Sequence, residues 1–199
     1  MNRGDLSAMR EVQGIHGPNM CLASSKFLAL KLLGFVERGK HLNDFLHSPW
    51  ARKHANLPLK SYWGGSMVEY NDAFNKVALP AALNDPSANV RTAGPQVKLL
   101  KGFTHFSNPG HAEVMLSQRT PLVVGVSIHG GTQRDHFIVI FGDSAGHTWA
   151  VDPWPGDDSA AVADLGSSFS FRTKTSVHMT ADEKQTTIPC GQPFFGYFQ

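Results

Sequence analysis

The fold class of this chain is decided by the stretch LVVGVSIHGGTQRDHFIVIFGDSAGHTWAVD, residues 122–152. It holds three short apolar runs, at residues 122–128, 136–141 and 148–152, that are rich in β-branched and aromatic residues. Runs of this length and composition are typical of buried strands. The segments between them contain glycine, aspartate and serine, which favour turns. We therefore predict three consecutive strands that form an antiparallel meander.

Ahead of these strands the apolar pattern is helical. Most residues in the stretch 21–33 are apolar, and Lys26 and Lys31 mark a narrow polar side. This pattern predicts a mostly buried helix. Asn19 is the expected N-cap of this helix, and Gly34 is the expected residue just beyond its end.

Helical patterns in the first half and strand patterns in the second indicate the α+β class. Further strands are expected near Ser168–Arg172 and at Phe194–Phe198. No internal repeat and no linker-like segment interrupts the sequence. We therefore predict one domain over residues 1–199, with a helical part at about 1–118 and a sheet part at about 119–199.

Composition excludes several classes of protein. Of the 199 residues, 41% are hydrophobic and 17% are charged, which argues against intrinsic disorder. The net charge of +2 divides into +6 over residues 1–101 and −4 over residues 102–199, and no basic run exceeds two residues. No nucleic-acid partner is expected from this pattern. No apolar stretch approaches the ~20 residues of a membrane span, and the first ten residues lack the apolar core of a signal peptide.

The two cysteines stand in different local contexts. Two are too few for a disulfide-dense scaffold or a multi-cysteine zinc module, so a disulfide, two inert thiols or one catalytic thiol remain. Cys21 begins the predicted helix, where the unpaired N–H groups and the helix dipole favour a thiolate. Cys190 precedes Pro193 and a predicted strand, so we interpret it as a structural or loop thiol. A Cys21–Cys190 disulfide is the alternative that would abolish the nucleophile.

A catalytic thiol also needs a base and a group that orients the base. His136 opens the second predicted strand, and Asp152 ends the third. In an antiparallel hairpin, the start of one strand lies beside the end of the next, so His136 and Asp152 are predicted neighbours. Gln13, eight residues before Cys21, is the candidate donor to an oxyanion. Trp154 is expected beside this group, either as a shield or as part of the core.

Metal and cofactor sites are not expected. His41, His47 and His54 lack the i, i+4 spacing that would set two ligands on one helix face. The paired glycines of the chain are not followed by the Lys-Ser/Thr of a phosphate-binding loop.

Three of these segments together resemble papain-like cysteine peptidases. Gln13…Asn19-Met20-Cys21-Leu22-Ala23-Ser24 resembles the start of their active-site helix, and the segment 136–142 resembles their histidine strand. The segment 151–156, Val-Asp-Pro-Trp-Pro-Gly, resembles the Asp-Pro-Trp segment of two bacterial branches. One branch comprises the leader-peptide-cleaving domains of bacteriocin exporters, and the other comprises effector proteases that bacteria inject into other cells. The injected effectors are the more similar, through Met-Cys-x-Ala-Ser and Asp-Pro-Trp-Pro together.

The resemblance implies a papain-like fold with a Cys21–His136–Asp152 triad and with Gln13 in the oxyanion hole. Asn19 and Trp154 would then contribute to substrate binding. The spacing between Gln13 and Cys21 is longer than is usual in those branches, so a backbone N–H or Asn19 is the alternative oxyanion donor.

The expected function is therefore that of a cysteine endopeptidase that cleaves a protein or peptide without a cofactor. An amidase, a deamidase or an acyl transferase, acting on peptidoglycan or on protein glutamine, could use the same triad. A catalytically idle binding module is the competing class. The resemblance to injected effectors implies a bacterial toxin of interbacterial competition, delivered by a specialised secretion system into the target cytoplasm. It also implies a cognate immunity or inhibitor protein, whereas neither nucleic acid nor membrane is an expected partner.

Overall fold

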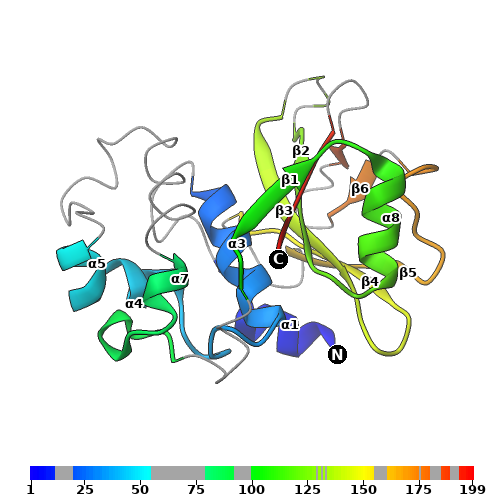
Figure 1. Ribbon diagram of the computed structural model, residues 1–199. Coiled ribbons are helices and arrows are strands. Elements are labelled where there is room, and N and C mark those ends of the chain that lie inside the picture. The colour runs from blue at the N-terminus through cyan, green and yellow to red at the C-terminus, as the bar shows by residue number, and fades with distance from the viewer. Residues whose placement is uncertain are drawn as a thin grey trace.

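The structure is a computed structural model of the chain, shown in Figure 1. It describes residues 1–11, 20–54, 79–91, 100–128, 130, 132, 134–154, 161–174, 176–179, 185–188 and 193–199. Helices in these parts are α1 (Arg3–Met9), α3 (Cys21–Leu32), α4 (Leu42–Leu46), α5 (Pro49–His54), α7 (Leu79–Ala82), the 3-10 helix η2 (Pro86–Ala88) and α8 (Pro109–Ser117). None of them is both long and apolar enough to cross a membrane.

The strands form one large sheet and one small one. They are β1 (Phe103–Phe106), β2 (Leu122–Val126), β3 (His136–Gly142), β4 (Thr148–Val151), β5 (Val162–Gly166), β6 (Ser176–His178), β7 (Gln185–Thr187) and β8 (Phe194–Phe198). The large sheet has the order β1-β8-β2-β3-β4-β5, and its neighbouring strands are antiparallel. The strands β6 and β7 pair separately. The predicted α+β class and the predicted meander, β2-β3-β4, are confirmed.

Two sequence expectations about strands need correction. Residues 168–172 consist of turns and irregular backbone, and the strand that follows β4 is β5. Phe169 and Phe171 give this stretch a strand-like alternation, but their rings are buried in the core without a ladder of backbone hydrogen bonds. In addition, β1 comes from the part of the chain that was expected to be helical, and it pairs with β8 at one edge of the sheet.

Helices cover both faces of the sheet. Figure 1 shows α3 between the sheet and the group of α4, α5 and α7, whereas α8 lies on the opposite side of the sheet. Phe27 and Leu30 of α3 share one core cluster with Val123 and Phe198 of the sheet. A second hydrophobic core cluster packs α8 against the other face of the sheet.

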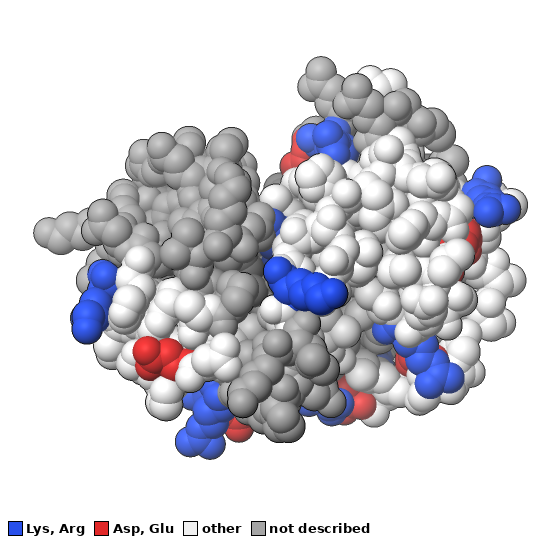
Figure 2. All heavy atoms as spheres, viewed as in Figure 1, with Lys and Arg blue, Asp and Glu red and all other residues white. Residues whose placement is uncertain are grey.

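On the face drawn in Figure 2, the Lys and Arg side chains of the described residues are scattered rather than gathered into one basic surface.

The helix α3 differs from its prediction at its polar side and at its start. Lys26 and Lys31 are 1% and 2% exposed, so the expected polar side is buried. The ammonium of Lys26 lies 4.3 Å from the centre of the Phe103 ring, and that of Lys31 pairs with Glu11. The N-cap is Met20 rather than Asn19. Gly34 follows the C-cap with a φ of +80°, as predicted for a residue that ends a helix.

Replacing Gly196 by Ala is expected to destabilise the protein by about 1–3 kcal/mol, because a Cβ there overpacks the sheet. The added atom would overlap Cζ of Phe103, so the ring would have to move. Gly39→Ala is the matched control, since nothing lies within 4 Å of its Cβ position. Urea denaturation measures both, and Phe103→Leu is expected to relieve part of the Gly196→Ala defect. Equal stability of the two alanine variants would contradict the expectation.

Candidate active site

Cys21 is the first residue of the 12-residue helix α3, and its thiol is free. The residue is 5% exposed. No side-chain hydrogen bond from the N-cap residue Met20 covers this helix start. The first N–H groups of a helix have no intrahelical partner, and the helix dipole favours a negative charge near them, so this position favours a thiolate at Cys21. The Cys21–Cys190 disulfide considered above is not formed, and Cys190 itself lies outside the described residues.

His136 and Asp152 are brought together by the hairpin of β3 and β4. Val139 pairs with Val151 in this hairpin, so Asp152 continues β4 towards the position opposite Ile138. His136 comes two residues before Ile138 in β3, so it is a diagonal neighbour of Asp152 across the two strands. Its Nε2 lies 2.6 Å from Oδ1 of Asp152, and both side chains are buried. The predicted proximity of these two residues is confirmed.

The Cys21 side chain lies close enough to the imidazole of His136 to affect the pKa of the ring. Burial lowers the pKa of His136, but the hydrogen bond with Asp152, the nearby Cys21 side chain and the charges of these two groups outweigh it and raise the pKa to about 9. Because Nε2 faces Asp152, Nδ1 is the ring nitrogen that Asp152 does not bind. With a pKa of about 9, the ring is an imidazolium at neutral pH and lies beside the Asp152 carboxylate.

The free energy of unfolding is expected to decrease as the pH rises from about 6.5 to 9. The folded pKa of His136, about 9, lies above the ordinary histidine value of 6.5, so the contribution is complete below pH 6.5 and is lost as the pH passes 9. The whole shift corresponds to about 3 kcal/mol at most. Denaturant unfolding across this range measures the slope, and His136→Gln is expected to remove the part due to this ring. An unchanged slope in His136→Gln would contradict the assignment.

Trp154 lies against the His136–Asp152 pair. Its indole meets the imidazole edge to face, with ring centres 5.4 Å apart and an interplanar angle of 84°. Its backbone N–H donates to the same Oδ1 of Asp152, at 2.7 Å. Trp154 is 38% exposed, so one part of the ring shields the pair while another part contacts solvent.

The sequence interpretation missed the residues Met9–Glu11, which lie beside this group. Arg10 donates from Nη1 to the carbonyl oxygens of Asp152 and Trp154, at 3.4 and 2.8 Å. The carboxylate of Glu11 pairs with Lys31 of α3. No local pattern identifies these residues, because their partners are remote in the sequence.

Two further residues predicted for the site, Gln13 and Asn19, lie outside the described residues. The triad assignment therefore depends on Cys21, His136 and Asp152, which the structure brings together. In the described parts of the chain, no group of three His, Cys, Asp or Glu side chains is arranged to hold a metal ion.

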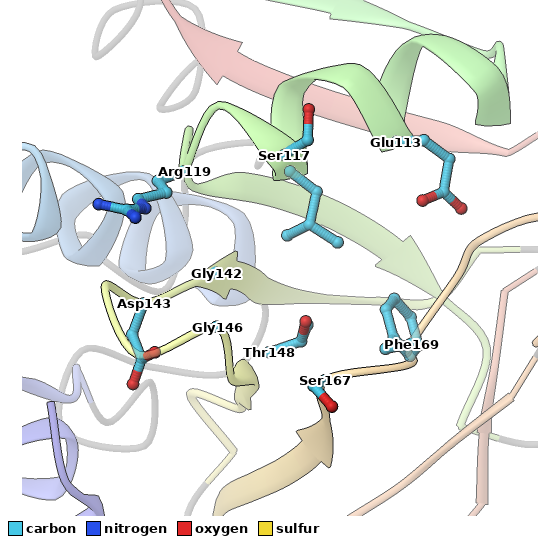
Figure 3. A pocket seen from close by; sticks show the side chains of 10 residues that line it. Glu113, Ser117, Arg119, Gly142, Asp143, Gly146, Thr148, Ser167 and Phe169 are labelled. Carbon is cyan, nitrogen blue, oxygen red and sulfur yellow. The ribbon is translucent and has the colours of Figure 1, made fainter.

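A separate depression of about 330 Å³ lies between α8 and the turn that joins β3 to β4 (Figure 3). It is at the far end of β3, about 20 Å along the strand from His136. Its two carboxylates, Glu113 and Asp143, already accept hydrogen bonds from the protein, including those from Ser170 and Trp149. The depression is therefore distinct from the Cys21 group and presents no unsatisfied carboxylate.

Three kinds of comparison bear on the identity of the chain. No protein-family model matches it, and no curated protein and no solved structure is significantly similar to it.

Proposed function

We propose that the protein is a cysteine endopeptidase with a papain-like arrangement, in which Cys21, His136 and Asp152 form the catalytic triad. One observation carries the proposal. The buried imidazole of His136 binds Asp152 at 2.6 Å, and the Cys21 side chain at the start of α3 lies close enough to the ring to contribute to its raised pKa. The order of the sequence motifs supports the same assignment independently.

The chemistry follows from this arrangement. The Cys21 thiolate attacks the carbonyl carbon of a peptide bond, and the imidazolium of His136 transfers its proton to the departing amine. The acyl group is then bound to sulfur as a thioester. A water molecule gives one proton to the now neutral imidazole and adds to the thioester, which releases the acid and restores the thiolate. Asp152 keeps the ring in the required tautomer and orientation throughout.

The tetrahedral oxyanion needs hydrogen-bond donors close to the sulfur. The backbone N–H of Cys21, in the first turn of α3, is the proposed first donor. Gln13 is the proposed second donor on the strength of the motif resemblance, with Asn19 as the alternative.

The proposed setting depends on the same resemblance. A protease of this kind, delivered by a bacterium into a competing cell, would act on a protein of the target cytoplasm. A cognate inhibitor that covers Cys21 would protect the producing cell.

A substrate screen with product identification tests the proposal. The wild-type protein and Cys21→Ala are incubated with a proteome-derived peptide library, with folded proteins and with peptidoglycan sacculi, and the products are identified by mass spectrometry. New peptide termini formed only by the wild type support an endopeptidase. Release of muropeptides would support the amidase alternative instead, and glutamate in place of glutamine would support the deamidase alternative. Product formation by Cys21→Ala would refute the triad.

A further inference from the structure

The segment Met9–Glu11 contacts two elements that carry members of the candidate triad, the helix α3 and the turn at residues 152–154. On one side it binds α3, the helix that carries Cys21. The Lys31 ammonium donates to the carbonyl oxygen of Met9 at 2.9 Å and pairs with the Glu11 carboxylate. The second oxygen of Glu11 accepts from the backbone N–H of Leu42, at 3.0 Å. These groups are buried, so solvent does not weaken them.

On the other side, the same segment binds the turn that carries Asp152. The Arg10 guanidinium, in a residue that is 5% exposed, donates to the carbonyl oxygens of Asp152 and Trp154. These carbonyls flank Pro153, which has no N–H to donate. The backbone N–H of Asp152 bonds the carbonyl of Ala161 at 2.8 Å. Arg10 is therefore a second restraint on this turn, supplied by a distant part of the chain.

The orientation of this turn determines the orientation of the Asp152 carboxylate. Its Oδ1 lies 2.6 Å from Nε2 of His136 and accepts the Trp154 N–H at 2.7 Å. A small rotation of the backbone at residues 152–154 would lengthen both contacts. Misplacement of a catalytic group by about 1 Å can reduce a rate about 100-fold.

We propose that Arg10 is a positioning residue for Asp152, and that the segment Met9–Glu11 holds the nucleophile helix in register with the Asp152 turn. This inference rests on the proposed function for its kinetic consequence, but its structural consequence can be measured without a substrate. Residues 9–11 thereby link the sulfur on α3 to the carboxylate beyond β4.

Titration of His136 by NMR separates positioning from the simpler roles of Arg10. Removing a positive charge near the ring would by itself raise the pKa of His136. If Asp152 loses its orientation, its hydrogen bond to the His136 ring weakens. This weakening lowers the pKa of His136 by about one unit. Arg10→Met is therefore expected to shift the titration to lower pH, and Arg10→Lys to shift it less. Arg3→Met is the matched control, since Arg3 is an exposed arginine of α1 and is expected to leave the titration unchanged.

A double-mutant cycle with Asp152→Asn completes the test. If Arg10 acts through Asp152, the shift caused by Arg10→Met disappears in the Asp152→Asn background, and in the wild-type background kcat falls about tenfold with KM unchanged. The inference would be overturned if Arg10→Met raised the pKa of His136 or left it unchanged. It would also be overturned if Arg10→Met shifted this pKa equally in the wild-type and Asp152→Asn backgrounds. If the Arg10→Met variant does not fold, the same double-mutant cycle is measured with Arg10→Lys in its place. Absence of any hydrolysis by the wild type would refute the proposed function instead, and the titration would still decide the role of Arg10.

Discussion

The rate at which iodoacetamide alkylates Cys21 is expected to stay nearly constant from pH 8 to pH 5 in the wild-type protein. In His136→Gln it should fall about tenfold per pH unit, or roughly 1000-fold over the range, because only the thiolate reacts. The reason is the proposed pairing of the Cys21 thiolate with the His136 imidazolium, whose pKa is raised to about 9. Below that pKa the imidazolium keeps its charge and stabilises the thiolate beside it.

The measurement is made in a Cys190→Ser background, so that a single thiol remains. The variants are compared by how the alkylation rate changes with pH rather than by the rate itself. This comparison removes differences in how easily the reagent reaches the buried sulfur. Asp152→Asn is expected to give an intermediate slope, because the ring keeps its place but loses the charged acceptor. A tenfold fall per pH unit in the wild type would exclude the proposed ion pair and favour the idle binding module.

Replacing Glu11 by Gln is expected to lower the free energy of unfolding by about 3–5 kcal/mol, since it leaves a buried charge without its partner. The side chains of Glu11 and Lys31 are 1% and 0% exposed. Burial lowers the pKa of Lys31, although the charge and hydrogen bond of Glu11 act against this. The second replacement, Lys31→Met, removes the stranded charge, so the double variant should recover much of the loss.

The control for this prediction is an ion pair on the surface. Glu37 and Arg91 lie 3.7 Å apart, with side chains that are 46% and 78% exposed. Glu37→Gln is expected to change the stability by no more than about 0.5 kcal/mol. Urea denaturation at neutral pH compares the variants, and a similar small effect of Glu11→Gln would show that the buried pair contributes little.

The parts of the site that the sequence predicts are those set by local pattern. Turn residues separate β2, β3 and β4, so their hairpins could be inferred without knowledge of any other segment. The closeness of His136 and Asp152 then followed from strand direction alone, since one residue opens β3 and the other follows β4. The buried helix that begins at Cys21 was predicted for the same reason, from its run of apolar residues.

The parts that sequence reasoning missed depend on contacts between remote segments. Lys31 reads as a surface residue because its partner, Glu11, is 20 residues away and belongs to another element. The carbonyl oxygens that bind Arg10 are 142 and 144 residues away. A periodic pattern records only neighbours on the same helix or strand. It therefore cannot reveal that a charged side chain will be buried against a distant partner.

The position of β8 in the large sheet has a consequence for how the protein is made. β8 is the last of the described strands along the chain, yet it lies between β1 and β2. A ribosome that adds about 5–20 residues per second needs roughly 5–20 seconds to proceed from β1 to β8. During that time β1 has no partner in the large sheet, and one edge of β2 is open to pairing with other chains. The large sheet, which contains His136, is therefore complete only after residue 198 has left the ribosome. An incomplete chain lacks the finished sheet against which the Cys21 helix α3 packs.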